Sequence, residues 1–363
     1  MSRLLSASII LLACAAAAAA AAPPAVVSIV GEKFFLNGKP TYAGRSWQGH
    51  SIEGLLFNSP MVQGGFDDLN PATRARWNFP DGKPWDPDRN TREFIAAMPE
   101  WKRHGLLAFT LNLQGGSPEG YSKAQPWINS AFAPDGTLRP DYAARAARIL
   151  DRADELGLVV ILGLFYFGQD ERLTDEAAVV RACDQTVDWI FAHGWRHVLI
   201  EVNNEANVRY DHAILKPERV HELIARIKAR SSDGRRLLVS TSYSGGKVPD
   251  ENVVRVADFI LVHGNGVTVS ARITEMVTQT RALPAWHPMP IVFNEDDHFD
   301  FEKPDNNFVA AVRAGASWGF FDYRMKGEGF ADGYQSVPVD WGINSPRKKA
   351  FFAKLREITG GLE

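Results

Sequence analysis

The sequence predicts an α/β protein, and within that class a (β/α)8 barrel. Eight short apolar runs alternate with eight amphipathic segments along the chain. The apolar runs are continuous, as in parallel strands that are covered on both faces. Eight strand–helix units are the number that a (β/α)8 barrel requires. No internal repeat and no low-complexity linker divides the chain, so we expect one domain over residues 23–363.

The elements are expected in a regular order after an N-terminal hairpin. "FFLNGKP" (34–40) predicts this hairpin, with its turn at Asn37-Gly38. The expected strands are 41–44, 106–111, 158–164, 197–202, 236–241, 258–262, 288–293 and 317–322. The expected helices are 91–103, 140–156, 175–192, 217–230, 251–257, 270–280, 306–314 and 346–358. Glycines at 105 and 157 end two of the helices, and prolines at 140, 217 and 346 begin three.

Another α/β fold with the same alternation is the doubly wound open sheet. That fold would need a glycine-rich nucleotide loop after its first strand, and Gly44-Arg45-Ser46-Trp47 is not such a loop. The chain has 40 basic and 43 acidic residues, a net charge of −3. This balance gives no reason to expect binding to nucleic acid or to an anionic membrane surface.

The first 22 residues are predicted to be a secretory signal peptide. A short basic start at Arg3 precedes an apolar stretch and a run of alanines. A buried N-terminal helix is the alternative. No later stretch approaches about 20 apolar residues, so no membrane span is expected. The mature protein should be secreted or periplasmic, and "LLAC" (11–14) leaves lipidation at Cys14 open. Without Cys14, only Cys183 remains, and no intrachain disulfide can form.

Two long loops follow expected strands, over residues 45–90 and 112–139. Loops after barrel strands lie over the C-terminal face, where the active sites of such barrels sit. Flat apolar rings beside hydrogen-bonding side chains suit sugars, and both kinds occur in these loops; the alternative is that the rings only pack the loops down. The aromatic residues are Trp47, Trp77, Trp85, Tyr121 and Trp127, and the polar ones are Arg45, His50, Asn78 and Asn129.

Polar and aromatic residues gather where the expected strands end. Beyond the loops, the candidates for binding a substrate are Asn112, Tyr166, Asn204, Tyr243, His263, Trp318, Tyr323 and Arg324. "VLIEVNNEAN" (198–207) also carries Glu201 and Glu205, which share the same strand parity. Glu201 should therefore point into the barrel, where a buried carboxylate needs a partner, and Arg45 is a candidate for it.

Two carboxylates from different strands of one face are typical of glycoside hydrolysis. One protonates the leaving oxygen, and the other attacks the anomeric carbon in a retaining enzyme, where the two stand about 5–5.5 Å apart. Glu205 on the fourth strand and Glu295 on the seventh are such a pair. Asn204 beside Glu205 is placed to hold the 2-hydroxyl of the sugar.

"IEVNNEA" (200–206) resembles the fourth-strand signature of clan A glycoside hydrolases, and is most similar to the cellulase-like family 5. "PIVFNE" (290–295) resembles the end of the clan's seventh strand, and His263 matches its usual sixth-strand histidine. The resemblance implies an exported retaining glycosidase, with Glu205 as acid/base and Glu295 as nucleophile. It implies a carbohydrate substrate and no metal or cofactor.

The chain departs from the clan pattern at two positions. Ala206 stands where proline is usual, and Asn265 stands where a tyrosine usually orients the nucleophile; Tyr243 or Tyr323 could replace that tyrosine. Two other functions stay open. One is a metal-dependent hydrolase that uses a mixed histidine and carboxylate site formed by His263, Glu295, Asp297 and His298. The other is a non-catalytic carbohydrate-binding barrel.

Overall fold

The structure is a computed structural model that describes residues 24–362. The expected signal peptide and Cys14 lie outside the described residues. Among the helices that are described, none combines the length and the apolar character that a membrane crossing needs.

The described chain forms a (β/α)8 barrel, as predicted. Four parallel strands make one continuous run in the order β6, β7, β8, β11, and β12 pairs in parallel with β13. Their bounds are β6 Ala108–Asn112, β7 Val159–Phe165, β8 Val198–Asn203, β11 Leu238–Ser240, β12 Ile260–His263 and β13 Ile291–Glu295. The amide of Asp258 joins the last two groups by donating to Val239 O at 3.0 Å.

Two short extended segments close the ring. Residues 57–60 bond to β6 on one side, where the amides of Ala108 and Thr110 donate to Phe57 O and Ser59 O. On the other side the Asn58 amide donates to Trp318 O at 3.1 Å. The segment around 317–320 also bonds to β13. These segments are the first and eighth strands of the barrel.

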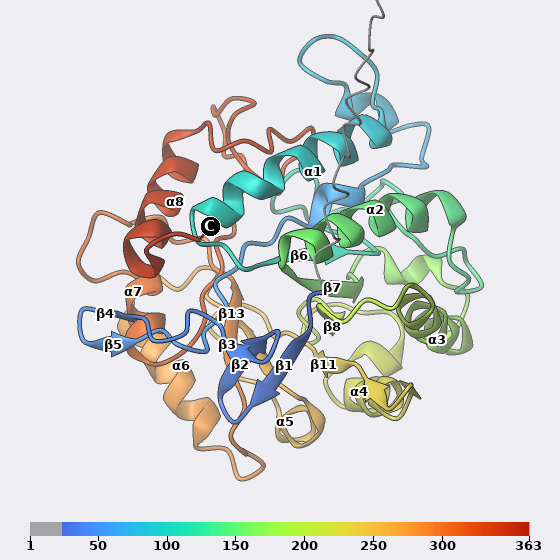
Figure 1. The fold of residues 1–363 in the computed structure, drawn as a ribbon. Helices are drawn as coiled ribbons and strands as arrows, with labels where there is room; N and C mark the ends of the chain where they lie inside the picture. The colour runs from blue at the N-terminus through green and yellow to red at the C-terminus, as the bar shows by residue number, and fades with distance from the viewer. Residues whose placement is uncertain (1–23, 363) are drawn as a thin grey trace, which may run out of the picture.

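Helices surround the strands on the outside (Figure 1). They are α1 Pro87–Arg103, α2 Pro140–Leu156, α3 Glu176–His193, α4 Val220–Lys228, α5 Glu251–Val256, α6 Ala271–Arg281, α7 Asn307–Arg313 and α8 Pro346–Thr359. Shorter 3-10 turns are η1 Val62–Gly65, η2 Arg74–Trp77, η3 Asp170–Arg172 and η4 Ala213–Leu215. All eight expected helices are present. Prolines begin α2 and α8 as predicted, and Gly157 ends α2 in a left-handed conformation.

The prediction of the first strand was wrong. Residues 41–44 form turns, and the barrel begins at 57–60 instead. The first long loop therefore runs from Met61 to Asp86, whereas the second extends from β6 to α2 as expected. The true first strand reads Phe-Asn-Ser-Pro, and a polar pair followed by proline is typical of a loop. Tertiary hydrogen bonds override that local preference.

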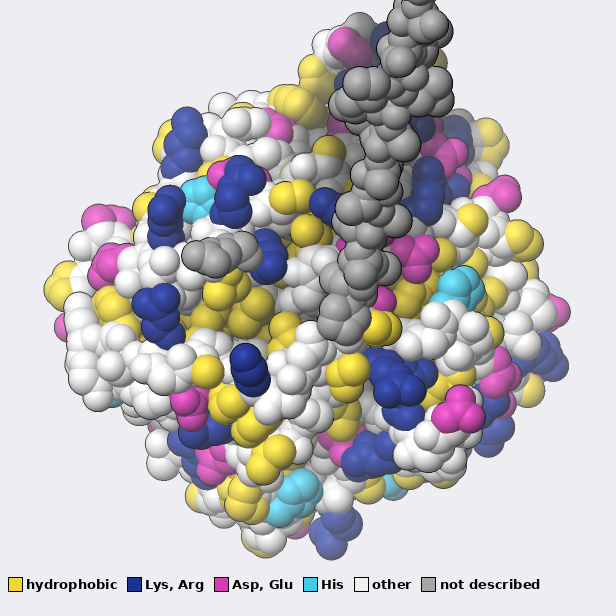
Figure 2. Space-filling model, in the orientation of Figure 1, with side chains coloured by type: hydrophobic (Ala, Val, Ile, Leu, Met, Phe, Trp, Pro, Cys, Tyr) yellow, Lys and Arg dark blue, Asp and Glu magenta, His cyan; other side chains and the backbone are white. Residues whose placement is uncertain are grey.

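Small hairpins cover the N-terminal end of the barrel. The first consists of β1 Val27–Val30, β2 Lys33–Leu36 and β3 Lys39–Pro40, with the expected turn at Asn37-Gly38. It lies in front of the barrel in Figure 1, and Val26 bridges to Arg196, just before β8. On this face, basic, acidic and apolar side chains are interspersed (Figure 2). Two further small antiparallel strand pairs are β4 Ser46–Trp47 with β5 His50–Ser51, and β9 Ser231–Ser232 with β10 Arg235–Arg236.

Arg45, Trp47 and His50 were expected at the catalytic face, and the structure corrects this. They precede the first barrel strand and lie near α8. The Trp47 indole donates to Glu357 Oε1 at 3.1 Å, and a side chain on Gly360 would collide with the Arg45 guanidinium. His50 is paired with Trp47 in the β4–β5 hairpin. Arg45 is therefore not the partner of Glu201.

Most aromatic rings of the long loops pack those loops down. Trp77 is buried between Phe66 and Trp127, at centroid distances of 5.5 and 5.7 Å. Trp85 is buried as well and stacks on Phe79. Of the five loop aromatics, only Tyr121 lines the pocket at the C-terminal ends of the strands.

Candidate active site

The end of β8 holds Glu205 in an unusual backbone conformation. Its φ is +52°, in the left-handed region that non-glycine residues seldom adopt. Neighbouring elements hold it there: the Glu205 amide donates to Ser242 Oγ at 2.8 Å, and the Asn204 amide donates to Phe165 O at 3.1 Å. The Tyr210 hydroxyl donates to Asn204 O at 2.5 Å. Such strain is stored at functional sites.

The same turn explains why Ala206 replaces the usual proline. The Ala206 amide donates to Ser242 O at 2.9 Å, a bond that proline cannot make. Proline also disfavours helical conformations in the residue before it, which here is Glu205. Ala206 is fully buried. Alanine at this position therefore keeps an amide hydrogen bond that helps to hold the turn at Glu205.

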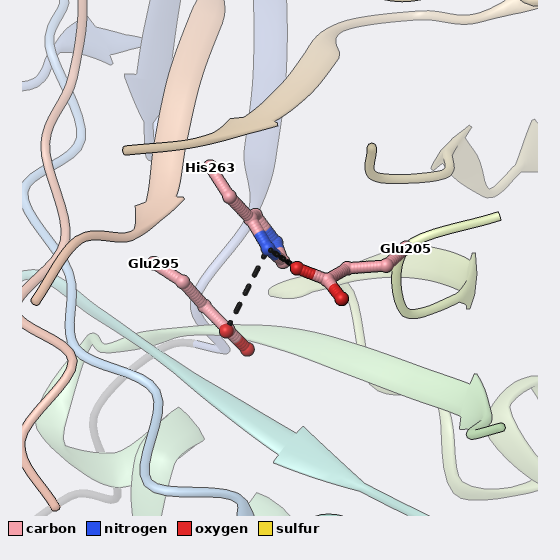
Figure 3. Close-up of side chains that lie close together, drawn as sticks. All are labelled: Glu205, His263 and Glu295. Carbon is pink, nitrogen blue, oxygen red and sulfur yellow. Dashed lines mark hydrogen bonds and ion pairs between the residues drawn. The ribbon is translucent and has the colours of Figure 1, made fainter. Parts of the chain in front are cut away.

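His263 lies between the two carboxylates (Figure 3). Its Nδ1 is 3.0 Å from Glu205 Oε1 and 3.6 Å from Glu295 Oε2. A bulge in the β12–β13 pairing sets His263 opposite Glu295. Burial lowers the pKa of His263, but the charges of Glu295 and Glu205 outweigh it and raise that pKa to about 9. The imidazole therefore carries a proton at neutral pH.

Glu295, at the end of β13, is held by a second donor. The Asn265 side chain donates to Glu295 Oε2 at 3.0 Å. Burial raises the pKa of Glu295 to about 7, helped by the charges of Glu205 and Glu201, while His263 and Asn265 act in the opposite direction. Asn265 thus takes the place of the usual tyrosine, and Tyr243 does not: its hydroxyl faces Asp250 at 3.4 Å.

Glu201 points into the barrel, as the strand parity predicts, and is 1% exposed. Its partner is Asn294, whose amide nitrogen is 3.5 Å from Glu201 Oε2. Burial raises the pKa of Glu201. Asn203 links β8 to η4 and to the end of β11, because it donates to Leu215 O at 2.8 Å and accepts from Thr241 Oγ1 at 2.6 Å.

Glu205 and Glu295 open into a cavity of about 260 Å³ at the C-terminal ends of the strands. Rings of Tyr121, Tyr166, Phe167 and Phe321 form much of its wall, together with Asn204 and Asn265. The second long loop closes one side, where the Tyr121 hydroxyl donates to Asp297 Oδ2 at 3.0 Å. Sequence reasoning missed Phe321 and Phe167, because a phenylalanine at a strand end cannot be told from a core residue.

Other expected site residues lie outside this cavity. Trp318 is fully buried and faces outward, stacked on Phe308 of α7. Arg324 donates to backbone oxygens of its own loop, including Pro338 O at 2.8 Å. Asn112 is buried against Gly163 of the adjacent strand. Tyr323 contacts Tyr121 edge-on and so supports the wall from behind.

Two groups of described residues present histidine and carboxylate atoms close enough for a cation. Glu205, His263 and Glu295 form one, with ligand atoms within 4.8 Å of one another, and Asp296, Asp297 and His298 form the other. The set proposed from sequence was His263, Glu295, Asp297 and His298, and the structure divides it between the two. In the first group, one oxygen of Glu205 lies within 4.8 Å of an oxygen of Glu295, which is near the carboxyl spacing of retaining glycosidases.

No protein-family model and no curated protein matches this sequence. Solved structures do share its fold. A family 5 mannosidase from Rhizomucor miehei aligns with a TM-score of 0.52 at 12% identity, covering 92% of this chain and 98% of its own. An endo-1,4-β-mannanase from the same organism gives 0.54 at 11%, covering 92% and 99%. A broad-specificity endoglucanase from Bacteroides salanitronis gives 0.52 at 13%, covering 84% and 92%. The resemblance to family 5 glycoside hydrolases is therefore confirmed at the level of the fold.

Proposed function

We propose that this protein is a retaining glycoside hydrolase. The observation that carries the proposal is the pair of glutamates at the ends of β8 and β13, with carboxylate oxygens within 4.8 Å and a histidine between them. The pair faces a cavity lined by aromatic rings, which suit the C–H faces of a sugar. An inverting enzyme would need about 6.5–9.5 Å between its carboxylates to admit a water molecule.

In the first step, ionised Glu295 attacks the anomeric carbon and forms a glycosyl ester. Glu205 takes a proton from His263 Nδ1, 3.0 Å from its Oε1, and gives it to the glycosidic oxygen, so the C–O bond breaks and the leaving group departs as an alcohol. Asn265 and protonated His263 hold Glu295 in position. Asn204, which lines the cavity beside Glu205, is placed to hold the 2-hydroxyl.

In the second step, Glu205 acts as a base. It takes a proton from water, and the water oxygen attacks the anomeric carbon and releases Glu295. Two inversions give a product with the starting configuration. Glu205 then returns this proton to His263 Nδ1, which restores the imidazolium for the next cycle.

Conservative replacement of each glutamate tests the assignment. Glu205→Gln and Glu295→Gln should each lower kcat for an aryl glycoside by at least about 1,000-fold, while thermal unfolding shows a folded protein. Glu155→Gln is the matched control, because Glu155 lies on the outer helix α2 with its side chain 63% exposed. Turnover near the wild-type rate in either site variant would refute the roles.

The proposal includes export. The basic start and alanine-rich stretch of residues 1–22 form the signal, and the mature enzyme acts outside the cytoplasm. N-terminal sequencing of the protein secreted by its native host, or found in its periplasm, should begin near residue 23. A mature chain that retains Met1 would contradict export.

Metal-dependent hydrolysis is the second candidate, because Glu205, His263 and Glu295 could also act as ligands. A chelator separates the two functions. Two-carboxylate chemistry predicts unchanged turnover after dialysis against EDTA. Loss of activity that returns on adding a divalent cation would favour the metal-dependent reaction.

A further inference from the structure

We infer that the sugar bound in this cavity carries an anionic group, and that Lys123 recognises it. The inference rests on the proposed function, since it names the substrate class of the same site. Its basis is a difference between two parts of the cavity lining. The carboxylates already accept hydrogen bonds, whereas two serines and a lysine of the second long loop have no acceptor among residues 24–362.

The acidic side of the cavity is already paired. Glu205 is bonded to His263, and Glu295 accepts from Asn265. Asp297, just outside, accepts from the Tyr121 hydroxyl at 3.0 Å and from the Gly266 amide at 2.8 Å. None of these carboxylates lies within 4 Å of a lysine or arginine nitrogen of the described residues, so none is paired with Lys123.

Another part of the lining is a short stretch of the second long loop, which we call the donor wall: Ser117, Ser122 and Lys123. All three line the cavity. The hydroxyl oxygens of Ser117 and Ser122 are buried and have no hydrogen-bond partner in the part of the chain that the structure describes, and Ser117 is only 2% exposed. Lys123 is exposed, and within residues 24–362 its ammonium makes no ion pair and no hydrogen bond. A buried hydroxyl without a partner is costly unless a ligand supplies one.

The positive charge of Lys123 indicates that the ligand is anionic. A hydroxyl can pair with a neutral sugar hydroxyl, but an ammonium only donates, and it binds anionic oxygen most strongly. The wall is also held in place: Tyr121 is tied to Asp297, and Gly120 packs against Tyr323 with φ +89°. Ser117, Ser122 and Lys123 would therefore donate hydrogen bonds to the acidic substituent of a sugar whose anomeric carbon lies at Glu295. The group is a carboxylate, as in a hexuronic acid, or a sulfate ester.

Matched aryl glycosides test the inference. We would measure kcat/KM for pairs that differ only at C6, a hexoside against its hexuronide and against its 6-sulfate, in the gluco, galacto and manno series. For one series, an anionic member should exceed the neutral one by at least about 10-fold. Lys123→Met should lower that ratio by about 10- to 100-fold. Lys123→Arg should preserve most of it, because the charge remains.

Lys349→Met serves as the control, because Lys349 is exposed on α8, away from the cavity. Its ratio should equal that of the wild type. Preference for the uronide over the sulfate would identify the carboxylate, and the reverse would identify sulfate. A neutral substrate hydrolysed as well as both anionic ones, or an unchanged ratio in Lys123→Met, would overturn the inference and leave the hydrolase intact.

Calorimetry separates this failure from failure of the proposed function. Glu295→Gln titrated with the free hexuronic acids, sulfated hexoses and neutral hexoses should bind an anionic sugar more tightly, and Lys123→Met in that background should abolish the preference. If the variant preferred anionic sugars but the wild type hydrolysed none of the glycosides, the inference about Lys123 would stand and the proposed hydrolase function would be refuted. No preference in binding would overturn the inference.

Discussion

Replacing Asn265 with alanine should move the pH dependence of the enzyme. Glu295 attacks in its ionised form, which exists above its pKa of about 7. The rate of the wild type should therefore rise as the pH passes about 7. It should fall again above about 9, where His263 loses its proton. Asn265 donates to Glu295 Oε2 at 3.0 Å and so favours the ionised form.

A hydrogen bond to a charged group contributes about 1.5–3 kcal/mol. Since 1.36 kcal/mol corresponds to one pKa unit, losing this bond should raise the midpoint of the acidic limb by about one to two pH units. The assay is kcat/KM against pH from 5 to 10, with thermal unfolding measured alongside. At pH 7 the ionised fraction of Glu295, and with it the rate, should fall about 5- to 50-fold in the variant, and part of that loss should be recovered at pH 9.

Asn207→Ala is the matched control. Asn207 sits close to the site, but its side chain bonds to Ser244 at 2.8 Å and not to Glu295. Its acidic limb should stay near 7. If Asn265→Ala lowered the rate equally at every pH, the amide would not tune the ionisation of Glu295, and this reasoning would be refuted.

Three further changes test other parts of the account. Ala206→Pro should lower stability by about 2 kcal/mol, or about 3 °C in Tm, because the amide that donates to Ser242 O is lost; an unchanged Tm and kcat would show that the turn does not depend on this bond. Trp47→Ala should lower the free energy of unfolding by about 3 kcal/mol, measured with urea, and leave kcat/KM unaltered, because Trp47 packs at the N-terminal end of the barrel. A loss of activity without a loss of stability would show that Trp47 belongs to the active site. Glu201→Gln should lower the pKa of His263 and move the alkaline limb of kcat/KM downward from about 9, since the charge of Glu201 raises that pKa; an unmoved limb would mean that the two groups are not coupled.

The sequence was a good guide wherever local pattern and tertiary structure agree. The continuous apolar runs of β7 and β8 and the first-turn prolines of α2 and α8 predicted those elements closely. The positions of Glu205, His263 and Glu295 followed from the rule that strand ends share one face. The charge and parity of Glu201 likewise predicted a buried carboxylate.

The errors came from residues whose environment is set at long range. Residues 57–60 are a barrel strand only because β6 and the 317–320 segment supply hydrogen bonds on both sides. Because the first strand was predicted at 41–44, Arg45, Trp47 and His50 were expected at the C-terminal face of the barrel, whereas they lie at its N-terminal end. Trp318 faces outward because strand parity, which is invisible without the register, directs it to α7. Asn265 departs from the clan pattern in the sequence, but its bond to Glu295 depends on a loop geometry that no sequence pattern reports.

The most direct test of the central claim is chemical rescue by azide, which separates the nucleophile from the acid/base. Glu205→Ala and Glu295→Ala would each be supplied with an activated aryl glycoside and sodium azide, and the glycosyl azide would be examined by NMR. Without Glu205, azide should attack the glycosyl ester on Glu295 and give a product of retained configuration. Without Glu295, azide should fill the space of the nucleophile and give the inverted product. The same configuration from both variants, or rescue of neither, would contradict the proposed roles.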